Sequence, residues 1–273
     1  MNAIDLIRAG ELDAARKTLI GEVKASPADP RKRTLLFQVL SFLGKWDKAR
    51  RHLDTIAVQD PKMEASVQIY RNLINAETER EKVTNLEQPP SFLPEPPAYF
   101  EEYYSGVKNL AEKNIEKAKQ LFDQAEALRP TITGTLNDKA FEGLSDTDTF
   151  LSPFLEAIVH ERYVWIPFDA IRELIIPSPK TLLDLLWTQA SITTWEGLTM
   201  NCFLPVLYPG SSDHEDERIK LGRMTDWIPL GETFSKGVGQ HLYHVGNDEM
   251  AILEIRNVQF KFDGPQDTGD TND

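Results

Sequence analysis

The chain has 273 residues, of which 41% are hydrophobic, and it carries a formal net charge of −13. That length and apolar content suffice for two ordinary domains, each with its own core. The acidic balance argues against nucleic acid or an anionic membrane as a partner, because both require a basic face on the protein.

The excess negative charge belongs to the second half of the chain. Residues 1–130 contain 20 Lys and Arg against 20 Asp and Glu, whereas the remainder contains 10 against 23. The single cysteine, Cys202, allows no intrachain disulfide and is typical of a reducing compartment. No apolar run is long enough to span a bilayer, and the first residues lack a basic segment ahead of an apolar one. We therefore expect a cytoplasmic protein.

The N-terminal half repeats at a spacing of 34 residues. Residues 10–15 recur as residues 44–49, with glycine first and alanine last, and a leucine and a proline follow at equal distances in both copies. This period, with alanines where paired helices approach and a proline after the second helix, is the tetratricopeptide signature. A third copy has Lys113 at the glycine position and keeps the later register at Ala118, Phe122, Ala125 and Pro130. The gap before it predicts a degenerate repeat, whose first helix contains residues 67–74.

A proline-rich segment precedes the third copy. Five prolines between residues 89 and 97 predict an extended chain, because each removes an amide donor and restricts the residue before it. We interpret the segment as a linker that Phe92 and Leu93 anchor to a core. The alternative is a ligand for a proline-binding domain.

The first helix of the third pair has apolar residues on one face, at Phe100, Tyr103 and Val107. First helices line the concave surface of such repeats, so these residues form one predicted peptide-binding surface. The alternative is that a C-terminal domain packs over them, since an aromatic patch of this size is a liability when it is exposed.

Beyond residue 130 the sequence becomes rich in Gly, Thr and strand-forming runs. We predict a short helix at 153–159, a strand at 162–166, a helix at 170–174 and strands at 182–187, 192–195, 199–207 and 240–244. Residues 245–249 predict a hairpin turn, after which residues 250–255 run back alongside the strand at 240–244. The predicted fold class is α+β with two domains: a tetratricopeptide-like α-α superhelix over 1–132, packed against a smaller β-rich α/β domain over 133–264. A disordered acidic tail is predicted over 265–273.

Four aromatic residues of the second domain form a second predicted peptide-binding surface: Trp187, Trp195, Tyr208 and Trp227. Aromatic side chains dominate interface energetics when they are accessible. The alternative is that they fill the core of a small β-rich domain.

No set of residues assembles an acid, a base and a nucleophile, so we predict no catalytic residues, no metal and no cofactor. His241 and His244 have a helical metal-ligand spacing, but on the predicted strand, positions three apart face opposite sides. The acidic loop 211–217 surrounds His214 with carboxylates, yet it lacks the ligand register and glycine of a calcium loop. A metal-dependent hydrolase that uses this loop is the alternative function.

Motifs in the second half resemble those of the ImpE/TagJ family, accessory proteins of the bacterial type VI secretion system. They fall at residues 155–158, 162–163, 165–168, 184–187, 204–211, 225–227 and 237–240, and the resemblance covers nearly the full chain. The segment 146–153 departs from the family pattern, because Phe150 and Ser152 stand where the family more often has arginine and glycine.

The resemblance implies a non-catalytic cytoplasmic adaptor. Such a protein binds a short helix at the N-terminus of the small contractile-sheath subunit and modulates sheath handling by the AAA+ disassembly ATPase, through direct or indirect contact. Helix capture suits a repeat scaffold, because apolar anchors on a helix can enter a preformed concave surface. The family supplies no catalytic residues to carry over.

Overall fold

The computed structural model describes residues 1–261, so the predicted tail at 265–273 lies outside the described residues. The N-terminal half is helical: α1 (Ala3–Ala9), α2 (Leu12–Ala25), α3 (Pro30–Phe42), α4 (Trp46–Gln59), α5 (Glu64–Thr84), α6 (Phe100–Ala111) and α7 (Ile115–Leu128). No helix within residues 1–261 combines the length and apolar content needed to cross a membrane.

Tight turns define three helix pairs, α1–α2, α3–α4 and α6–α7, as the repeat register predicts. Gly10 and Gly44 end the first helices of two pairs with φ of 86° and 62°, a left-handed conformation that glycine adopts without strain. Lys113 adopts φ 65° at the same position of the third pair, without that freedom. In each pair the second helix packs against the first, and it carries a small, fully buried side chain: Ala15, Ala49 or Ala118.

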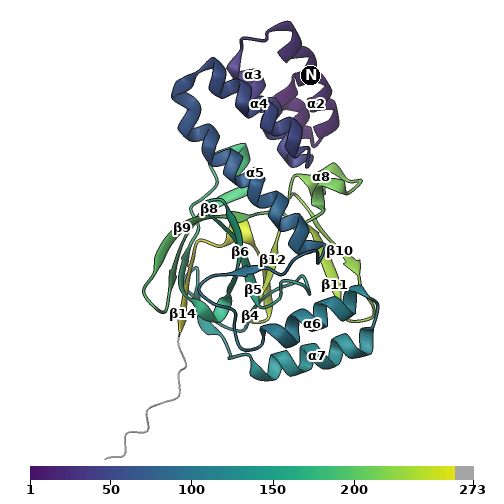
Figure 1. The fold of residues 1–273 in the computed structure, drawn as a ribbon, viewed down its shortest axis with the longest axis vertical. Helices are drawn as coiled ribbons and strands as arrows, with labels where there is room; N and C mark the ends of the chain where they lie inside the picture. Colours follow the sequence, from purple (N-terminus) through teal and green to yellow (C-terminus); the bar gives the residue numbers. More distant parts are fainter. Residues whose placement is uncertain (262–273) are drawn as a thin grey trace, which may run out of the picture.

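Helix α5 takes the place of the degenerate repeat. It contains the predicted helix at 67–74, but within residues 1–261 no second helix of the same repeat follows it, because the prolines between residues 89 and 97 keep the following chain extended. Figure 1 shows α5 leading from the first four helices across the strands, with α6 and α7 at its far end. The third pair therefore does not stack directly on the second.

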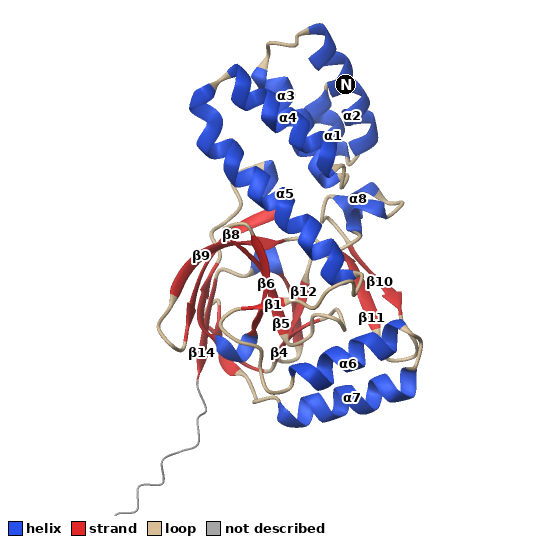
Figure 2. Cartoon of the chain, viewed as in Figure 1, coloured by secondary structure: helices blue, strands red, loops and turns tan. Residues whose placement is uncertain are grey.

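The C-terminal half is built mainly from strands (Figure 2). Within residues 1–261 the main sheet has nine strands in the order β1-β6-β5-β9-β8-β7-β14-β2-β3, of which β1 comes from the proline-rich segment, and two smaller sheets have the orders β10-β11 and β13-β12-β4. The bounds are β1 (Ser91–Phe92), β2 (Thr133–Leu136), β3 (Lys139–Glu142), β4 (Leu144–Asp146), β5 (Phe154–Val159), β6 (Arg162–Pro167), β7 (Ile171–Ile175), β8 (Trp187–Thr194), β9 (Thr199–Pro205), β10 (Thr225–Pro229), β11 (Ser235–Gly239), β12 (Leu242–Val245), β13 (Asp248–Ala251) and β14 (Asn257–Lys261). The α+β class is thus confirmed. The division at residues 132 and 133 falls between α7 and β2 and stays a prediction.

Three local predictions were wrong. Residues 153–159 form strand β5, not a helix, since a short continuous apolar run fits either element and here it is buried on both faces. Residues 170–174 lie mostly in strand β7, after a 3-10 turn at Phe168–Ala170. Residues 182–187 begin with a 3-10 helix, Leu182–Leu185, because Thr181 and Asp184 cap its start reciprocally. The strand at 162–166 and the β12–β13 hairpin are confirmed.

The proline-rich segment is held against the core, as interpreted from the sequence. Ser91 and Phe92 pair in parallel with β6, and the amide of Leu93 donates to the Trp165 carbonyl at 3.1 Å. The Phe92 ring lies 4.5 Å from Phe100 and 5.6 Å from Phe154, measured between ring centroids. The segment therefore joins the helical half to an edge of the main sheet.

A segment of the second half, which contains the short helix α8 (Glu217–Lys220), holds the first helix pair from outside. Glu217 accepts from the amide of Asp13 at 3.0 Å, which caps the N-terminus of α2. Arg223 donates to the carbonyls of Ile7 and Arg8 at the end of α1, both at 2.8 Å. Figure 1 shows α8 directly beside these first helices. The two halves are therefore joined at several points along the chain.

Candidate functional site

The predicted peptide-binding residues of α6 are buried. Phe100, Tyr103 and Val107 have exposures of 8%, 7% and 1%. The Tyr103 ring lies 5.6 Å from Phe154 of the sheet, and its hydroxyl donates to the Thr149 carbonyl. A peptide could reach these side chains only if the third pair moved away from the sheet, and binding there stays a prediction.

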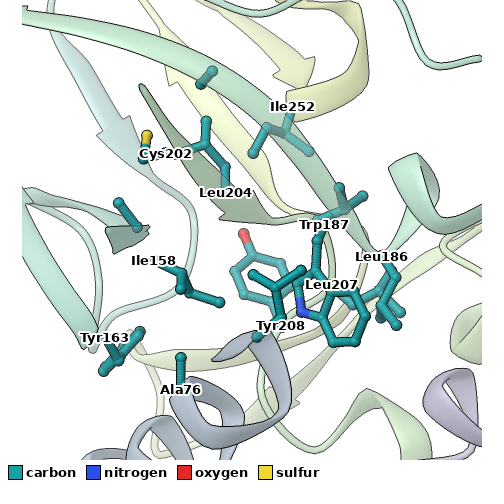
Figure 3. Packing of buried hydrophobic residues seen from close by; sticks show 14 of the residues in the cluster. Ala76, Ile158, Tyr163, Leu186, Trp187, Cys202, Leu204, Leu207, Tyr208 and Ile252 are labelled. Carbon is teal, nitrogen blue, oxygen red and sulfur yellow. The ribbon is translucent and has the colours of Figure 1, made fainter. Parts of the chain in front are cut away.

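The predicted aromatic surface of the second half is divided. Trp187 and Tyr208 are each 1% exposed, and Figure 3 shows both inside the apolar cluster that includes Leu186 and Leu207. Trp195 is half-buried, and Trp227 is 37% exposed on the β10 strand. These four side chains do not form one exposed patch, and their part in peptide binding also stays a prediction.

A buried charge network joins α5 to the sheet, with Arg80 at its centre. The guanidinium donates to Glu156 of β5 through Nε at 2.8 Å and Nη2 at 2.5 Å, and to the Leu207 carbonyl at 2.7 Å. Glu77, one turn earlier on α5, accepts a hydrogen bond from Arg80 Nη1 at 3.3 Å and another from the Trp187 indole N–H at 2.7 Å. The helical half and the sheet thus share one set of charges.

His241 and two aspartates extend the network from the other side. The Nδ1 atom of His241 lies 2.7 Å from Asp146 Oδ2, and the Nε2 atom of the same ring lies 3.0 Å from Glu156 Oε2. The Tyr208 hydroxyl donates to Asp146 at 2.7 Å. Asp148 accepts from the amide of Gly237 at 2.7 Å. All the ionisable members of this side are almost inaccessible to solvent.

The partners decide which members are charged. Burial lowers the pKa of His241, but the carboxylates of Asp146 and Glu156 outweigh it and raise that pKa to about 9. Burial works to raise the pKa of Glu156, but Arg80 holds that pKa well below its usual range. Burial and the charge of Asp146 raise the pKa of Asp148 to about 7. At neutral pH the network therefore contains two cations, Arg80 and His241, around the ionised Glu156.

This arrangement has a structural role between α5 and the sheet. Within residues 1–261, no group of three His, Cys, Asp or Glu side chains is placed to hold a metal ion. Burial raises the pKa of the Cys202 thiol to about 12, so the nucleophilic thiolate is absent at neutral pH. The charges of the network are directed at one another, which holds α5 on the sheet.

Part of this network has a signal in the sequence, although the predicted site residues do not include it. Glu77 and Arg80 share the helical register of the buried Leu73 and Val83, so they are charged residues at core positions. Such residues are almost never buried without a partner. The sequence could therefore indicate buried ion pairing, but not that Glu156 and His241 provide the partners.

The acidic loop serves mainly as a set of helix caps. Asp216 caps α8 through the Arg218 amide at 2.8 Å, and His214 Nδ1 accepts from the Asp216 amide at 3.0 Å. Glu217 caps α2 through the Asp13 amide. Two of the four carboxylates that the hydrolase alternative would use, Asp216 and Glu217, therefore accept hydrogen bonds from backbone amides of two helices.

Two of the hollows formed by the described residues concern peptide binding, and both involve the helical half. One is a polar cleft of about 270 Å³ between the α3–α4 turn, α5 and the 207–213 loop, with Arg80 and Tyr208 in its wall. The other is an apolar groove of about 630 Å³ along α1, α3 and the 3-10 turn Pro61–Met63. In this groove Ile4 is 50% and Met63 41% exposed, and Leu35 is half-buried. The groove lies along the first helices of two pairs, which line the concave side in such repeats.

Comparisons with known proteins agree with this architecture. Residues 138–259 match the family model described as ImpE protein. The type VI secretion system accessory component TagJ of Pseudomonas aeruginosa is 33% identical over 261 residues, which covers 96% of this chain and 92% of TagJ. The crystal structure of protein VPA1032 from Vibrio parahaemolyticus shares the fold, with a TM-score of 0.83 at 23% identity over 95% of this chain and 97% of that one. Since the identity to TagJ extends over almost the whole chain, this protein belongs to the ImpE family.

Proposed function

We propose that the protein is a non-catalytic, cytoplasmic accessory component of the type VI secretion system that binds the N-terminal helix of the small sheath subunit. The identity to TagJ over almost the full length of both chains supports the role as an accessory component of this secretion system. By holding the sheath subunit, the protein would modulate sheath handling by the AAA+ disassembly ATPase.

The apolar groove along α1 and α3 is the proposed site for the helix. Ile4, Leu35 and Met63 offer apolar contacts, and the rim is polar, with Glu22, Lys32 and Gln38. An amphipathic helix pairs an apolar stripe with polar flanks, and it fits a groove of this composition. The groove is also open, whereas Phe100, Tyr103 and Tyr208 are buried.

The proposal can be tested by titrating the protein with a fluorescent peptide that spans the sheath subunit's N-terminal helix. We expect saturable binding with a micromolar or lower Kd. Ile4→Glu and Met63→Glu should each weaken binding about tenfold, because each removes an apolar contact of roughly 1.5 kcal/mol. Val58→Glu is the control, since Val58 is 82% exposed and lies outside the groove.

Absence of saturable binding to the wild-type protein would contradict the adaptor function. Tight binding that survives both groove substitutions would instead place the peptide elsewhere. The exposed Trp227 would then be the next position to test, through Trp227→Ala.

A further inference from the structure

A third hollow, of about 310 Å³, lies between α2, α4 and the α8 segment, and its lining is basic. Its lining contains the cations Arg16, Lys45, Lys48 and Lys220 and the acidic Asp13, together with the uncharged Leu40, Leu43 and Ser212. Arg16 pairs with Asp13 at 3.0 Å. The three lysines form no ion pair with any residue of the described 1–261 range. The hollow therefore concentrates unpaired positive charge in a chain whose net charge is −13.

The position of two of these lysines does not favour the helix that carries them. Lys45 is the N-cap of α4 and Lys48 is its third residue. The N-terminus of a helix bears partial positive charge, so cations there are unfavourable and anions are favourable. The first pair has Glu11 and Ala14 at the corresponding positions, 34 residues earlier. Helix stability therefore does not explain why the second pair has lysines here.

The first pair shows which chemistry satisfies this position. There the amide of Asp13, the second residue of α2, donates to the carboxylate of Glu217 at 3.0 Å. Asp47 is the corresponding residue of α4, and that helix has no side-chain cap from Lys45. The same chain thus places a carboxylate from a distant segment on one helix N-terminus, whereas the equivalent one has lysines on both sides of Asp47 in its own first turn.

We propose that this basic hollow binds an acidic segment of a partner protein, with its carboxylates on Lys45, Lys48 and Lys220. The first turn of α4 would add to the attraction, as helix N-termini do for anions. Because the whole chain is strongly acidic, its overall field repels such a segment, and only the local lysines can attract it. The site is separate from the apolar groove, and the proposal does not depend on sheath binding.

Fluorescein-labelled hexaglutamate, titrated into the full chain at low salt, is a direct probe. We expect saturable binding that weakens as salt is raised, because exposed charges are screened. Lys45→Gln combined with Lys48→Gln should weaken binding about tenfold, from the loss of two charge contacts. The matched control combines Lys17→Gln and Lys24→Gln, which removes the same charge from exposed positions of α2 outside the hollow.

The outcomes separate clearly. Binding that is lost in the hollow variant and kept in the control supports the proposal. Equal weakening in both variants would show attraction without a site and would overturn it. Absence of hexaglutamate binding would also overturn the proposal. Pyrophosphate is titrated in parallel, and a protein that binds pyrophosphate but not hexaglutamate would have a phosphate site instead of the proposed peptide site. The four substituted lysines of the two variants are exposed, so both variants should fold, and far-ultraviolet circular dichroism checks this.

Discussion

His241 shows how a side chain can be charged in a place that water hardly reaches. It is 1% exposed, yet carboxylates lie 2.7 and 3.0 Å from its two ring nitrogens. Burial lowers the pKa of this imidazole, but Asp146 and Glu156 raise it to about 9. Removing one member of such a pair costs more than the pair contributes, because the remaining charge is left unpaired.

The stability of the protein should therefore fall as pH rises from 7 to 9. The pKa of His241 is about 9 in the folded protein and near 6.5 in the unfolded chain, so the folded state binds this proton more tightly. The resulting stabilisation is fully present below pH 6.5 and is lost as pH rises through about 9. We expect a loss on the order of 2 kcal/mol in the free energy of unfolding, measured by urea denaturation. His241→Gln should largely remove this dependence, whereas the exposed His244→Gln should keep it. An unchanged slope in His241→Gln would contradict the assigned charge.

At the scale of elements, the turns between paired helices determine the repeat geometry. Gly44 turns the chain from α3 into α4 with φ 62°, and a Cβ there would lie 2.6 Å from the Ser212 hydroxyl oxygen. Lys113 makes the equivalent turn from α6 into α7 with φ 65°. The same backbone conformation is thus unstrained in one pair and strained in another.

Substitutions at these two turns should have opposite effects on stability. Gly44→Ala should destabilise the protein by about 2 kcal/mol, from left-handed strain and the contact with Ser212. Lys113→Gly should stabilise it by up to about 1 kcal/mol, because it relieves the same strain. Gly21→Ala is the control, because Gly21 lies within α2 and a Cβ there would meet no other atom within 4 Å. It should stabilise the protein by about 0.5–1 kcal/mol, since alanine favours a helix more than glycine does. Thermal unfolding measures all three, and destabilisation by Lys113→Gly would contradict the strain.

At the scale of the whole molecule, α5 belongs to both halves. Its first part packs against α4, and Glu77 and Arg80 near its end bind residues of the sheet. The proline-rich segment and the α8 segment add two further connections. The relative placement of the repeats and the sheet is therefore fixed by buried contacts as well as by the chain itself.

Arg80→Met should cost about 3–5 kcal/mol of unfolding free energy, because it leaves Glu77 without its cation and Glu156 with His241 alone. Arg71→Met is the matched control on the same helix. Arg71 pairs with the exposed Asp54 and Glu64, so its loss should cost about 1 kcal/mol or less. Guanidinium denaturation of both variants gives the comparison. Similar costs for the two would show that the buried network contributes little.

The sequence by itself determined the helix pairs, because the 34-residue period, the turn glycines and the buried alanines act over a few neighbouring residues. It also determined the anchored proline segment and the β12–β13 hairpin. Only the tertiary structure decided that residues 154–159 form a central strand, since a short apolar run fits a strand or a helix until its neighbours are known. It also decided which aromatics are buried, and that Arg80, Glu156 and His241 meet, because their contacts join residues more than 70 positions apart.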